Sequence, residues 1–315
     1  MITGLELKGF RGIRETAEPI PLKKFNVLVG RNNSGKTAVL EALALLPRPD
    51  ATLPMTSFSR LNFIISQHNS RTDSLVYGYA GQATLTFQGD EANAKYEIDT
   101  QTKLVQHVIT DSIFESRNVS CYTSPDVYRF IQNELVRENT WKALEKTRAH
   151  NYVVRDVINP AVSDKFTEII PQFLQKEGIW ILQARKEFPD GTSAYIRLSE
   201  IGAGVQRVIV PLLWFEAAKP SIVLWDDIEA SMHPSLLENV LRWLASKDWQ
   251  IVISTHSIDV LHTLTDVGPK HMQVITLSKT PDDILMRRTL TLDELQTFIE
   301  HGTDPRRLAD LLLLK

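Results

Sequence analysis

The chain has 315 residues, of which 43% are hydrophobic and 23% charged, and this composition predicts a globular protein with a sizeable core. The net charge of −3 and the pI near 6.3 do not indicate a nucleic-acid binder, although a local basic groove remains compatible with them. The single cysteine, Cys121, excludes an intramolecular disulfide and a zinc cluster. The sequence shows no signal peptide and no apolar run of the roughly 18 residues that span a bilayer. We therefore expect a cytoplasmic protein that does not enter a membrane.

The N-terminal part of the chain reads as a β-rich lobe over residues 1–124. Apolar and polar side chains alternate over residues 2–10, which predicts a strand, and a second strand ends at Gly30. Residues 47–62 contain several prolines and read as an irregular connection. Short apolar runs with close spacing follow, and they predict antiparallel hairpins. These four runs are 75–79, 83–87, 95–98 and 104–109.

Residues 30–37, GRNNSGKT, match GxxxxGK[ST] in full and lie between an apolar strand and a helical pattern. Such a loop turns its backbone N–H groups and a helix N-terminus toward a polyphosphate. Lys36 would reach the β and γ phosphates, and the Thr37 hydroxyl would complete a Mg²⁺ shell. The alternative is a glycine turn that merely closes a βα unit, but the flanking elements favour phosphate binding. The candidate contacts are Gly30, Arg31, Asn32, Asn33, Ser34, Gly35, Lys36, Thr37 and Ala38.

From residue 125 to 178 the apolar spacing becomes helical, including the run 166–174, and predicts a helical insertion. Strands near 179–184 and 194–198 then return the chain to a sheet. The next helix opens with Gly202 and Gly204, and a glycine pair at a helix start leaves backbone N–H groups exposed.

Residues 221–229, SIVLWDDIE, form a continuous apolar strand that ends in carboxylates. An unbroken apolar strand implies burial on both faces in a parallel sheet, whose carboxyl ends line the ligand crevice. We expect Asp226 to hold Mg²⁺ opposite Thr37, and either Asp227 or Glu229 to polarise an attacking water. The alternative is that these acids are simply solvated, and the phosphate loop upstream argues against it.

A further apolar strand, residues 250–254, leads into His256, which should reach the same rim and could hydrogen-bond a γ-phosphate oxygen. A purely structural histidine is the alternative. His233 precedes a helix, and we expect a structural or interface role for it. We assign residues 179–280 to a core that contains these motifs, and 281–315 to a tail of amphipathic helices whose apolar end is either core or a docking surface.

The segments FRG, GRNNSGKT, IGAGVQR, LWDDIEASMHP and STHS occur in the order found in ABC-type ATPases of the SMC, RecF and OLD kind. The chain most resembles stand-alone OLD-like AAA-type ATPase domains, over roughly residues 1–46 and 195–280. The resemblance implies an α/β P-loop NTPase of the ABC-ATPase type, a single domain over 1–315 with a mixed sheet core, an antiparallel β lobe and a helical insertion. The chain ends about 60 residues after His256, so we expect no TOPRIM nuclease domain.

The resemblance also implies roles for individual residues. Asp226 matches the magnesium-coordinating acid, and Asp227 takes the place of the usual catalytic glutamate. Glu229 matches the further glutamate of the family, and His256 matches the switch histidine. Arg11 sits where related heads carry a basic residue near the nucleotide.

Residues 202–206, including Gly202, Gly204 and Gln206, match the signature loop that touches the γ-phosphate of the opposite subunit. This sequence departs from the family pattern in two places that bear on activity. Gly202 replaces the signature serine, and Asp227 is one methylene shorter than glutamate, which could move the carboxylate by about 1 Å and slow hydrolysis. For the glutamine loop, Gln67 and Gln82 are the two candidates, and either could be an ordinary polar residue.

The implied function is an ATPase that uses ATP and Mg²⁺, closes as a homodimer of heads on ATP, and drives a conformational switch. The resemblance suggests DNA repair or defence against phage, with a nuclease or toxin partner as effector, and it allows DNA as a ligand. A nucleotide-gated scaffold with negligible hydrolysis is the alternative, which Asp227 favours. A P-loop small-molecule kinase is a weaker one, because the sequence shows neither an acceptor pocket nor a lid.

Overall fold

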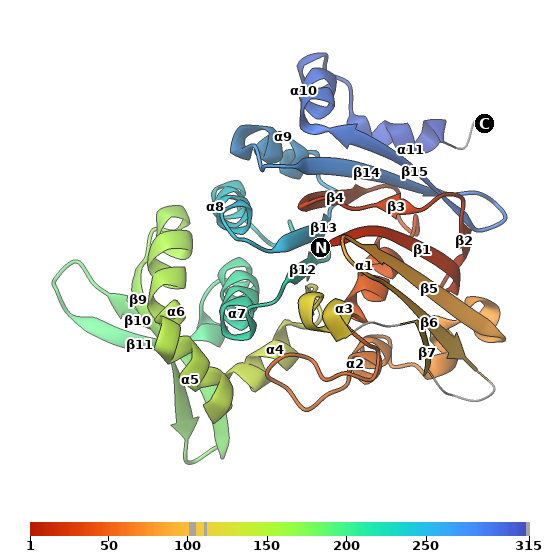
Figure 1. Cartoon of the computed structure of the whole chain (residues 1–315). Coiled ribbons are helices and arrows are strands. Elements are labelled where there is room, and N and C mark those ends of the chain that lie inside the picture. Colours follow the sequence, from red (N-terminus) through yellow and green to blue (C-terminus); the bar gives the residue numbers. More distant parts are fainter. Residues whose placement is uncertain (101–104, 110–111, 313–315) are drawn as a thin grey trace.

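The computed structural model describes residues 1–100, 105–109 and 112–312, which form one large mixed sheet and one small antiparallel sheet with helices around them (Figure 1). Within these residues the large sheet has the order β7-β6-β5-β1-β2-β15-β14-β4-β13-β12-β8, with β3 paired to β1, and the small sheet has the order β11-β10-β9. The strands are β1 Ile2–Phe10, β2 Ile13–Thr16, β3 Ile20–Pro21, β4 Phe25–Val29, β5 Gln82–Gly89, β6 Asn93–Asp99, β7 Val105–Ile109, β8 Ser120–Thr123, β9 Lys165–Leu174, β10 Ile179–Glu187, β11 Ser193–Arg197, β12 Ile222–Trp225, β13 Gln250–Ser254, β14 Met272–Lys279 and β15 Ile284–Thr291. The helices are α1 Lys36–Ala44, α2 Arg60–Gln67, α3 Ser112–Arg117, α4 Tyr128–Leu135, α5 Glu138–Thr147, α6 Ala149–Tyr152, α7 Ala203–Ala218, α8 Pro234–Ala245, α9 Ile258–Val267, α10 Leu292–Glu300 and α11 Leu308–Leu311.

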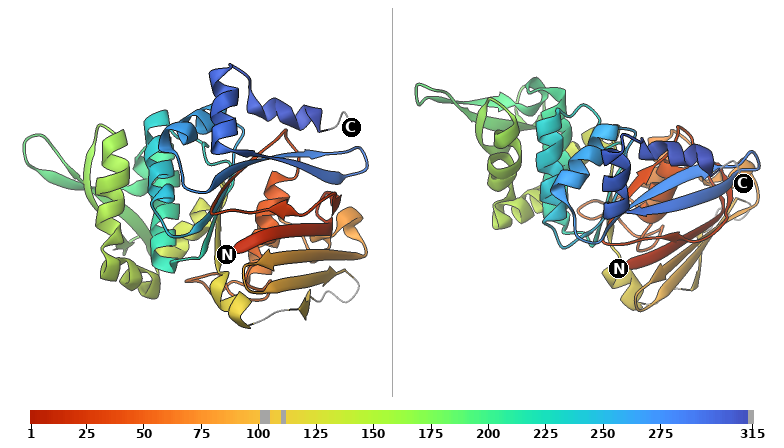
Figure 2. Two further views of the ribbon diagram at one scale, coloured as in Figure 1. Left: turned by 45° about the horizontal axis from the view of Figure 1, so that its top comes forward. Right: turned by 90° about the horizontal axis from the view of Figure 1, so that it is seen from above.

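The central part of the large sheet is parallel. Strands β8, β12, β13, β4 and β14 run in one direction, so their carboxyl ends share one edge. Every residue of β4, β12 and β13 is buried, because α1 covers one face of these strands and α7, α8 and α9 lie on the other side (Figures 1 and 2). Strands buried on both faces read as continuous apolar runs. The parallel sheet predicted from residues 221–229 and 250–254 is confirmed.

The outer part of the large sheet is antiparallel, with β1 paired to β5, β5 to β6 and β6 to β7. This confirms three of the four predicted short strands, although residue 104 lies outside the described residues. The prediction of a strand at 75–79 is wrong. Two tight 3₁₀ turns, Thr72–Leu75 and Tyr77–Tyr79, occupy this stretch, because consecutive residues there adopt left-handed φ values that a strand does not accommodate.

The predicted helical insertion is correct only in its first part. Helices α4, α5 and α6 and a following π-helical turn, Val153–Ile158, are helical as expected. The prediction for 166–174 is wrong, because this run lies in strand β9. The β9–β10 register shifts by a bulge next to Phe166, so Phe166 and Ile169 are both buried although three residues apart. That spacing imitates the repeat of a helix.

Two connecting regions also differ from the sequence expectation. Helix α2 begins at Arg60, so the irregular connection ends before residue 62. The guanidinium of Arg60 is buried and donates to the carbonyl oxygens of Ala44 and Ser120, which ties α2 to the core. The tail contributes strand β15 to the large sheet before helices α10 and α11.

Across the part of the chain that the structure describes, no helix has the length and apolar character needed to cross a membrane.

Candidate functional site

The loop between β4 and α1 surrounds the N-terminus of α1 and needs glycine at two positions. Gly35 has a left-handed φ of 96°, and a Cβ on Gly30 would lie 2.4 Å from the carbonyl oxygen of Leu277. The loop borders a cavity of about 850 Å³. The predicted phosphate contacts that line this cavity are Asn32, Asn33, Ser34, Gly35, Lys36, Thr37 and Ala38, whereas Gly30 and Arg31 are not among its described lining residues.

Lys36 is buried at the start of α1 with its ammonium group turned into the loop. Its Nζ donates to the carbonyl oxygens of Gly30 at 3.0 Å and Arg31 at 3.1 Å. Burial lowers the pKa of Lys36, and the carboxylates of Asp227, Asp226 and Glu229 oppose that shift. The charge is therefore surrounded by acceptors at the position where the motif needs a cation.

Asp226 and Thr37 meet across the edge of the sheet. The Thr37 hydroxyl donates to Oδ2 of Asp226 at 2.8 Å, and the Ser254 hydroxyl donates to the other carboxylate oxygen. Burial raises the pKa of Asp226, against the effect of these two hydrogen bonds. A hydroxyl and a carboxylate side by side are hard oxygen ligands that suit Mg²⁺ when phosphates and waters complete its shell. The described residues contain no cluster of three or more His, Cys, Asp or Glu that could hold a metal alone.

The three remaining predicted groups occupy distinct positions. Asp227 has a left-handed φ of 48°, and its carboxylate lies 3.7 Å from Nε2 of His256; both residues line the cavity. Glu229 accepts a hydrogen bond from the backbone N–H of His256 at 2.7 Å, and its Oε2 is buried with no hydrogen-bond partner among the described residues. Glu229 thus braces the loop after β13, and Asp227 faces the cavity.

Arg11 lines the cavity, as its position in the motif pattern suggested. Its Nε donates to Glu41 at 2.6 Å and its Nη1 to the Ser74 hydroxyl at 3.0 Å. The other oxygen of Glu41 lies 2.5 Å from Nε2 of His68. Sequence reasoning missed Glu41 and His68. Glu41 follows Thr37 by four residues, so helical periodicity could have found it. His68 directly follows the end of α2, far from the loop in sequence, and has no local signal.

The signature residues lie apart from this cavity. Gly202 caps α7, and Gly204 packs so closely that an added Cβ would lie 2.2 Å from the carbonyl oxygen of Ser231. The Gln206 amide donates to the carbonyl oxygen of Ile201 at 2.5 Å. None of these three is among the described residues that line the cavity.

Neither candidate for the glutamine loop reaches the site. The Gln67 amide donates to the carbonyl oxygen of Phe63 within α2, and the Gln82 amide donates to Glu97 on the antiparallel strands. Both are absent from the described lining of the cavity, so we drop the interpretation of either as a nucleotide-contacting glutamine. His233 accepts from the N–H of Ser235 and caps α8, which is the structural role predicted for it.

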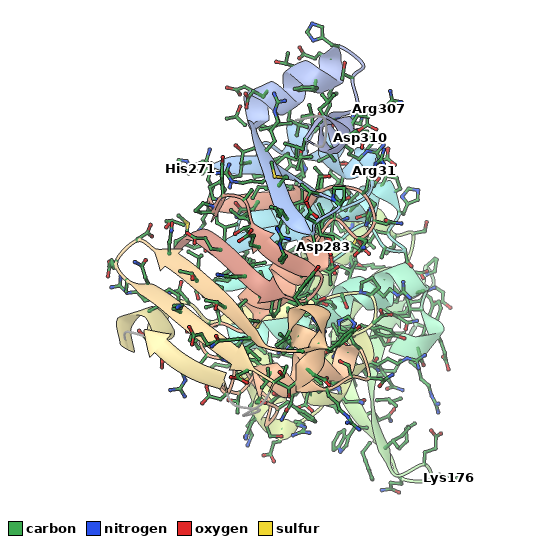
Figure 3. The ribbon with its side chains drawn as sticks, turned by 90° about the vertical axis from the view of Figure 1, so that its right-hand side faces the viewer. Arg31, Lys176, His271, Asp283, Arg307 and Asp310 are labelled. Carbon is green, nitrogen blue, oxygen red and sulfur yellow. The ribbon has the colours of Figure 1, made fainter. Side chains whose placement is uncertain are left out.

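The C-terminal segment contacts two loops of the site, the one before α1 and the one after β13. Asp310 pairs with Arg31 of the loop at 2.7 Å, and the two residues lie together in Figure 3. Arg306 donates to the carbonyl oxygen of His256 at 2.5 Å and pairs with Asp304 at 2.6 Å. Residues 304–310 therefore connect the loop before α1 to the loop after β13.

The fold and the loop–helix arrangement define an α/β P-loop ATPase head of the ABC type. Two family models match the chain: "AAA ATPase domain" over residues 1–103 and "AAA domain, putative AbiEii toxin, Type IV TA system" over residues 123–261. Both models describe AAA-type ATPase domains, and each covers less than half of the chain. No curated protein sequence matches it significantly.

Solved structures of Smc head domains share this fold. An Smc head bound to the C-winged helix domain of ScpA has 16% sequence identity and a TM-score of 0.61, over 93% of this chain and 98% of that one. A Pyrococcus furiosus Smc head bound to the C-terminal domain of ScpA has 14% identity and a TM-score of 0.58, over 96% and 99%. A Pyrococcus yayanosii Smc head with a coiled coil and joint has 11% identity and a TM-score of 0.56, over 96% and 99%. At these identities the likeness concerns the fold.

Proposed function

We propose that this protein binds and hydrolyses ATP with Mg²⁺ and that ATP closes two heads into a dimer. The observation that carries the proposal is the contact between Thr37 and Asp226 at 2.8 Å, next to the buried ammonium of Lys36. These groups come from different elements, α1 and the end of β12, and a turn that merely closed a βα unit would not need them together. Their chemistry matches a metal-bound triphosphate.

The β and γ phosphates of ATP would replace the carbonyl oxygens of Gly30 and Arg31 as partners of Lys36. Thr37 and Asp226 would hold Mg²⁺, which when bound neutralises phosphate charge and aligns the γ-phosphoryl group. Lys36 then stabilises the charge that develops as the bond to the β-phosphate oxygen breaks.

Asp227 is the better candidate for orienting the attacking water, because it faces the cavity while Glu229 is engaged with the backbone of His256. The water oxygen bonds to the γ-phosphorus, the β–γ bridging bond breaks, and Asp227 accepts the water proton before releasing it to solvent. The products are ADP and inorganic phosphate. His256 would donate to a γ-phosphate oxygen and so sense its presence.

The position of the signature residues supports this dimer. Gly202, Gly204 and Gln206 lie outside the described lining of the cavity, and in the proposed dimer a second head would bring its own copies to the γ-phosphate. The conformational change would be read by an effector protein, a nuclease or a toxin, in DNA repair or phage defence. One matched family includes a putative toxin of a type IV toxin–antitoxin system, and an Smc head of the same fold binds a domain of ScpA. Both support a protein partner, and DNA is a further candidate ligand.

A test compares wild type with Lys36→Ala, with the exposed Lys270→Ala as a matched control, in steady-state ATP turnover and light-scattering mass with and without DNA. We expect turnover to fall about 100-fold or more in Lys36→Ala only, and mass to double with ATP in the wild type. Turnover that persists in Lys36→Ala would contradict the assignment of the site. DNA stimulation would identify a second ligand.

The second candidate is a nucleotide-gated scaffold with negligible hydrolysis, and the shorter side chain of Asp227 on a left-handed backbone favours it. Under this alternative the wild type binds ATP and dimerises without turnover. Asp227→Glu should then raise turnover by about 10- to 100-fold, because the longer side chain restores the reach to the water. Unchanged turnover in Asp227→Glu would remove the alternative's main support.

A further inference from the structure

The cavity extends well beyond the loop that would hold the phosphates. Its volume of about 850 Å³ is in the upper part of the range, about 300–1,000 Å³, of pockets that enclose a whole small-molecule ligand. A second part of the lining comes from the stretch between α2 and β5. The lining residues in this wall are His68, Ser70, Ser74, Val76, Tyr77, Gly78 and Tyr79.

Tyr79 stands out in this wall because most of the residue is exposed to solvent. It is 71% exposed, more than any other large apolar or aromatic side chain that the structure describes as exposed. Its phenol has no hydrogen-bond partner within the described residues, although its backbone N–H donates to the carbonyl oxygen of Val76. The residue also adopts a left-handed φ of 64°, directly after Gly78 at 63°. Left-handed conformations are uncommon for tyrosine, and such strain concentrates at ligand sites.

Tyr77, unlike Tyr79, is held by a side-chain hydrogen bond. Its hydroxyl donates to Asp283 at 2.9 Å, and Asp283 also pairs with Lys279 at 2.9 Å. Lys279 in turn donates to the carbonyl oxygen of Gly12, next to the cavity residue Arg11. Figure 3 shows Asp283 in the turn between β14 and β15. The wall is therefore anchored to the large sheet on one side and leaves one aromatic ring facing solvent at the cavity.

We propose that Tyr79, with Tyr77 as the anchored part of the wall, forms the base subsite of the nucleotide. The inference rests on the proposed function, since it takes the phosphates to lie on the loop before α1. A nucleoside triphosphate held there extends its ribose and base along the cavity, and the uncovered ring of Tyr79 offers the flat apolar surface on which a base stacks. Stacking uses the face that every base has, so this platform favours a base-bearing triphosphate over a bare one without strong discrimination among bases.

The test measures binding of MgATP, MgGTP and inorganic tripolyphosphate by calorimetry to wild type, Tyr79→Ala and Tyr79→Phe. We expect Tyr79→Ala to bind MgATP roughly 5- to 150-fold more weakly, the range that loss of one stacked base gives, with tripolyphosphate binding unchanged. Tyr79→Phe keeps the ring and should bind MgATP like the wild type. MgGTP should weaken in parallel with MgATP.

The outcomes separate this subsite from the site as a whole. Wild-type affinity for MgATP in Tyr79→Ala overturns the base subsite, and so does an equal loss of MgATP and tripolyphosphate, which indicates a structural effect. A wild type that binds neither ligand, or binding that Lys36→Ala leaves intact, overturns the proposed function instead. Photolabelling of the wild type with an 8-azidoadenosine triphosphate gives an independent readout. Label within residues 76–81 supports the subsite, and label confined to other segments contradicts it.

Discussion

The parallel edge of the large sheet and the small sheet β9–β11 bury their apolar residues to very different degrees. Strands β12 and β13 are buried along their whole length. In the small sheet, Ile169 and its partner Ala184 are buried at the base, but Phe173 and its partner Trp180 at the tip are 45% and 52% exposed. Figure 2 shows this sheet projecting from the body, and Figure 3 places Lys176 at its end, far from Arg31.

The difference shows where the fold tolerates change. The candidate site lies on the edge that is covered on both faces, where each side chain has one packed position, so catalytic groups can be held at fixed distances. The projecting sheet continues the apolar face of its own base into solvent. Sequence change at its tip should therefore leave the parallel edge and the cavity intact. Substitutions in the two regions should differ accordingly in their effects on stability and on ATP turnover.

The largest expected effect on stability is at the centre of the parallel edge. Leu224 is fully buried in β12, two residues before Asp226. Leu224→Ala should lower the free energy of unfolding by about 2–5 kcal/mol, because it removes buried contacts and leaves a cavity. Urea unfolding followed by circular dichroism measures the change. A loss under about 1 kcal/mol would contradict the close packing of this edge.

Substitution of Asp226 should have a smaller effect on stability, and it should raise stability instead of lowering it. Because burial raises its pKa, the folded state holds the proton more tightly than the unfolded state does. Protonation of Asp226 therefore stabilises the folded state. This contribution to stability is complete below the unfolded-state pKa and is lost as pH rises through the folded-state pKa. Above the unfolded-state pKa, the burial of this carboxyl therefore costs stability in the nucleotide-free protein. Asp226→Asn should raise Tm at pH 7 and flatten the change in Tm between about pH 4 and pH 7.

Thermal unfolding across that pH range measures the effect at Asp226, with the exposed Asp126→Asn as the control. The control should show the wild-type pH dependence. A lower Tm for Asp226→Asn at pH 7 would mean that its hydrogen bonds from Thr37 and Ser254 outweigh the cost of burying the charge. The same variant should lose Mg²⁺-dependent ATP binding, since it replaces a charged ligand with a neutral one.

The smallest effect is expected at the tip of the small sheet. The rings of Trp180 and Phe173 have centroids 5.4 Å apart, and both residues are about half exposed. Trp180→Ala should cost about 1 kcal/mol or less, the value of one exposed aromatic pair. ATP turnover should remain that of the wild type. A turnover change above about tenfold with unchanged stability would show that the two regions are coupled.

Sequence periodicity was sufficient for the parts of the fold in which burial follows a simple pattern. The apolar runs of β4, β12 and β13 and the alternation in β1 predicted their strands correctly. It was not sufficient at 166–174, where a bulge produces helical spacing in a strand, or at 75–79, where left-handed residues make turns. Both errors concern backbone conformations that hydrophobicity does not encode.

The sequence by itself determined the chemical identity of the loop before α1 and the order of acids and histidine along the chain, because those depend on local spacing. Tertiary structure alone decided which groups meet: the contact of Thr37 with Asp226, the bracing of His256 by Glu229, and the placement of Tyr77 and Tyr79 in the lining of the cavity. These partners are far apart in sequence and arrive on separate elements. Only the packing of the sheet and its helices brings them together at one edge of the sheet and the cavity beside it.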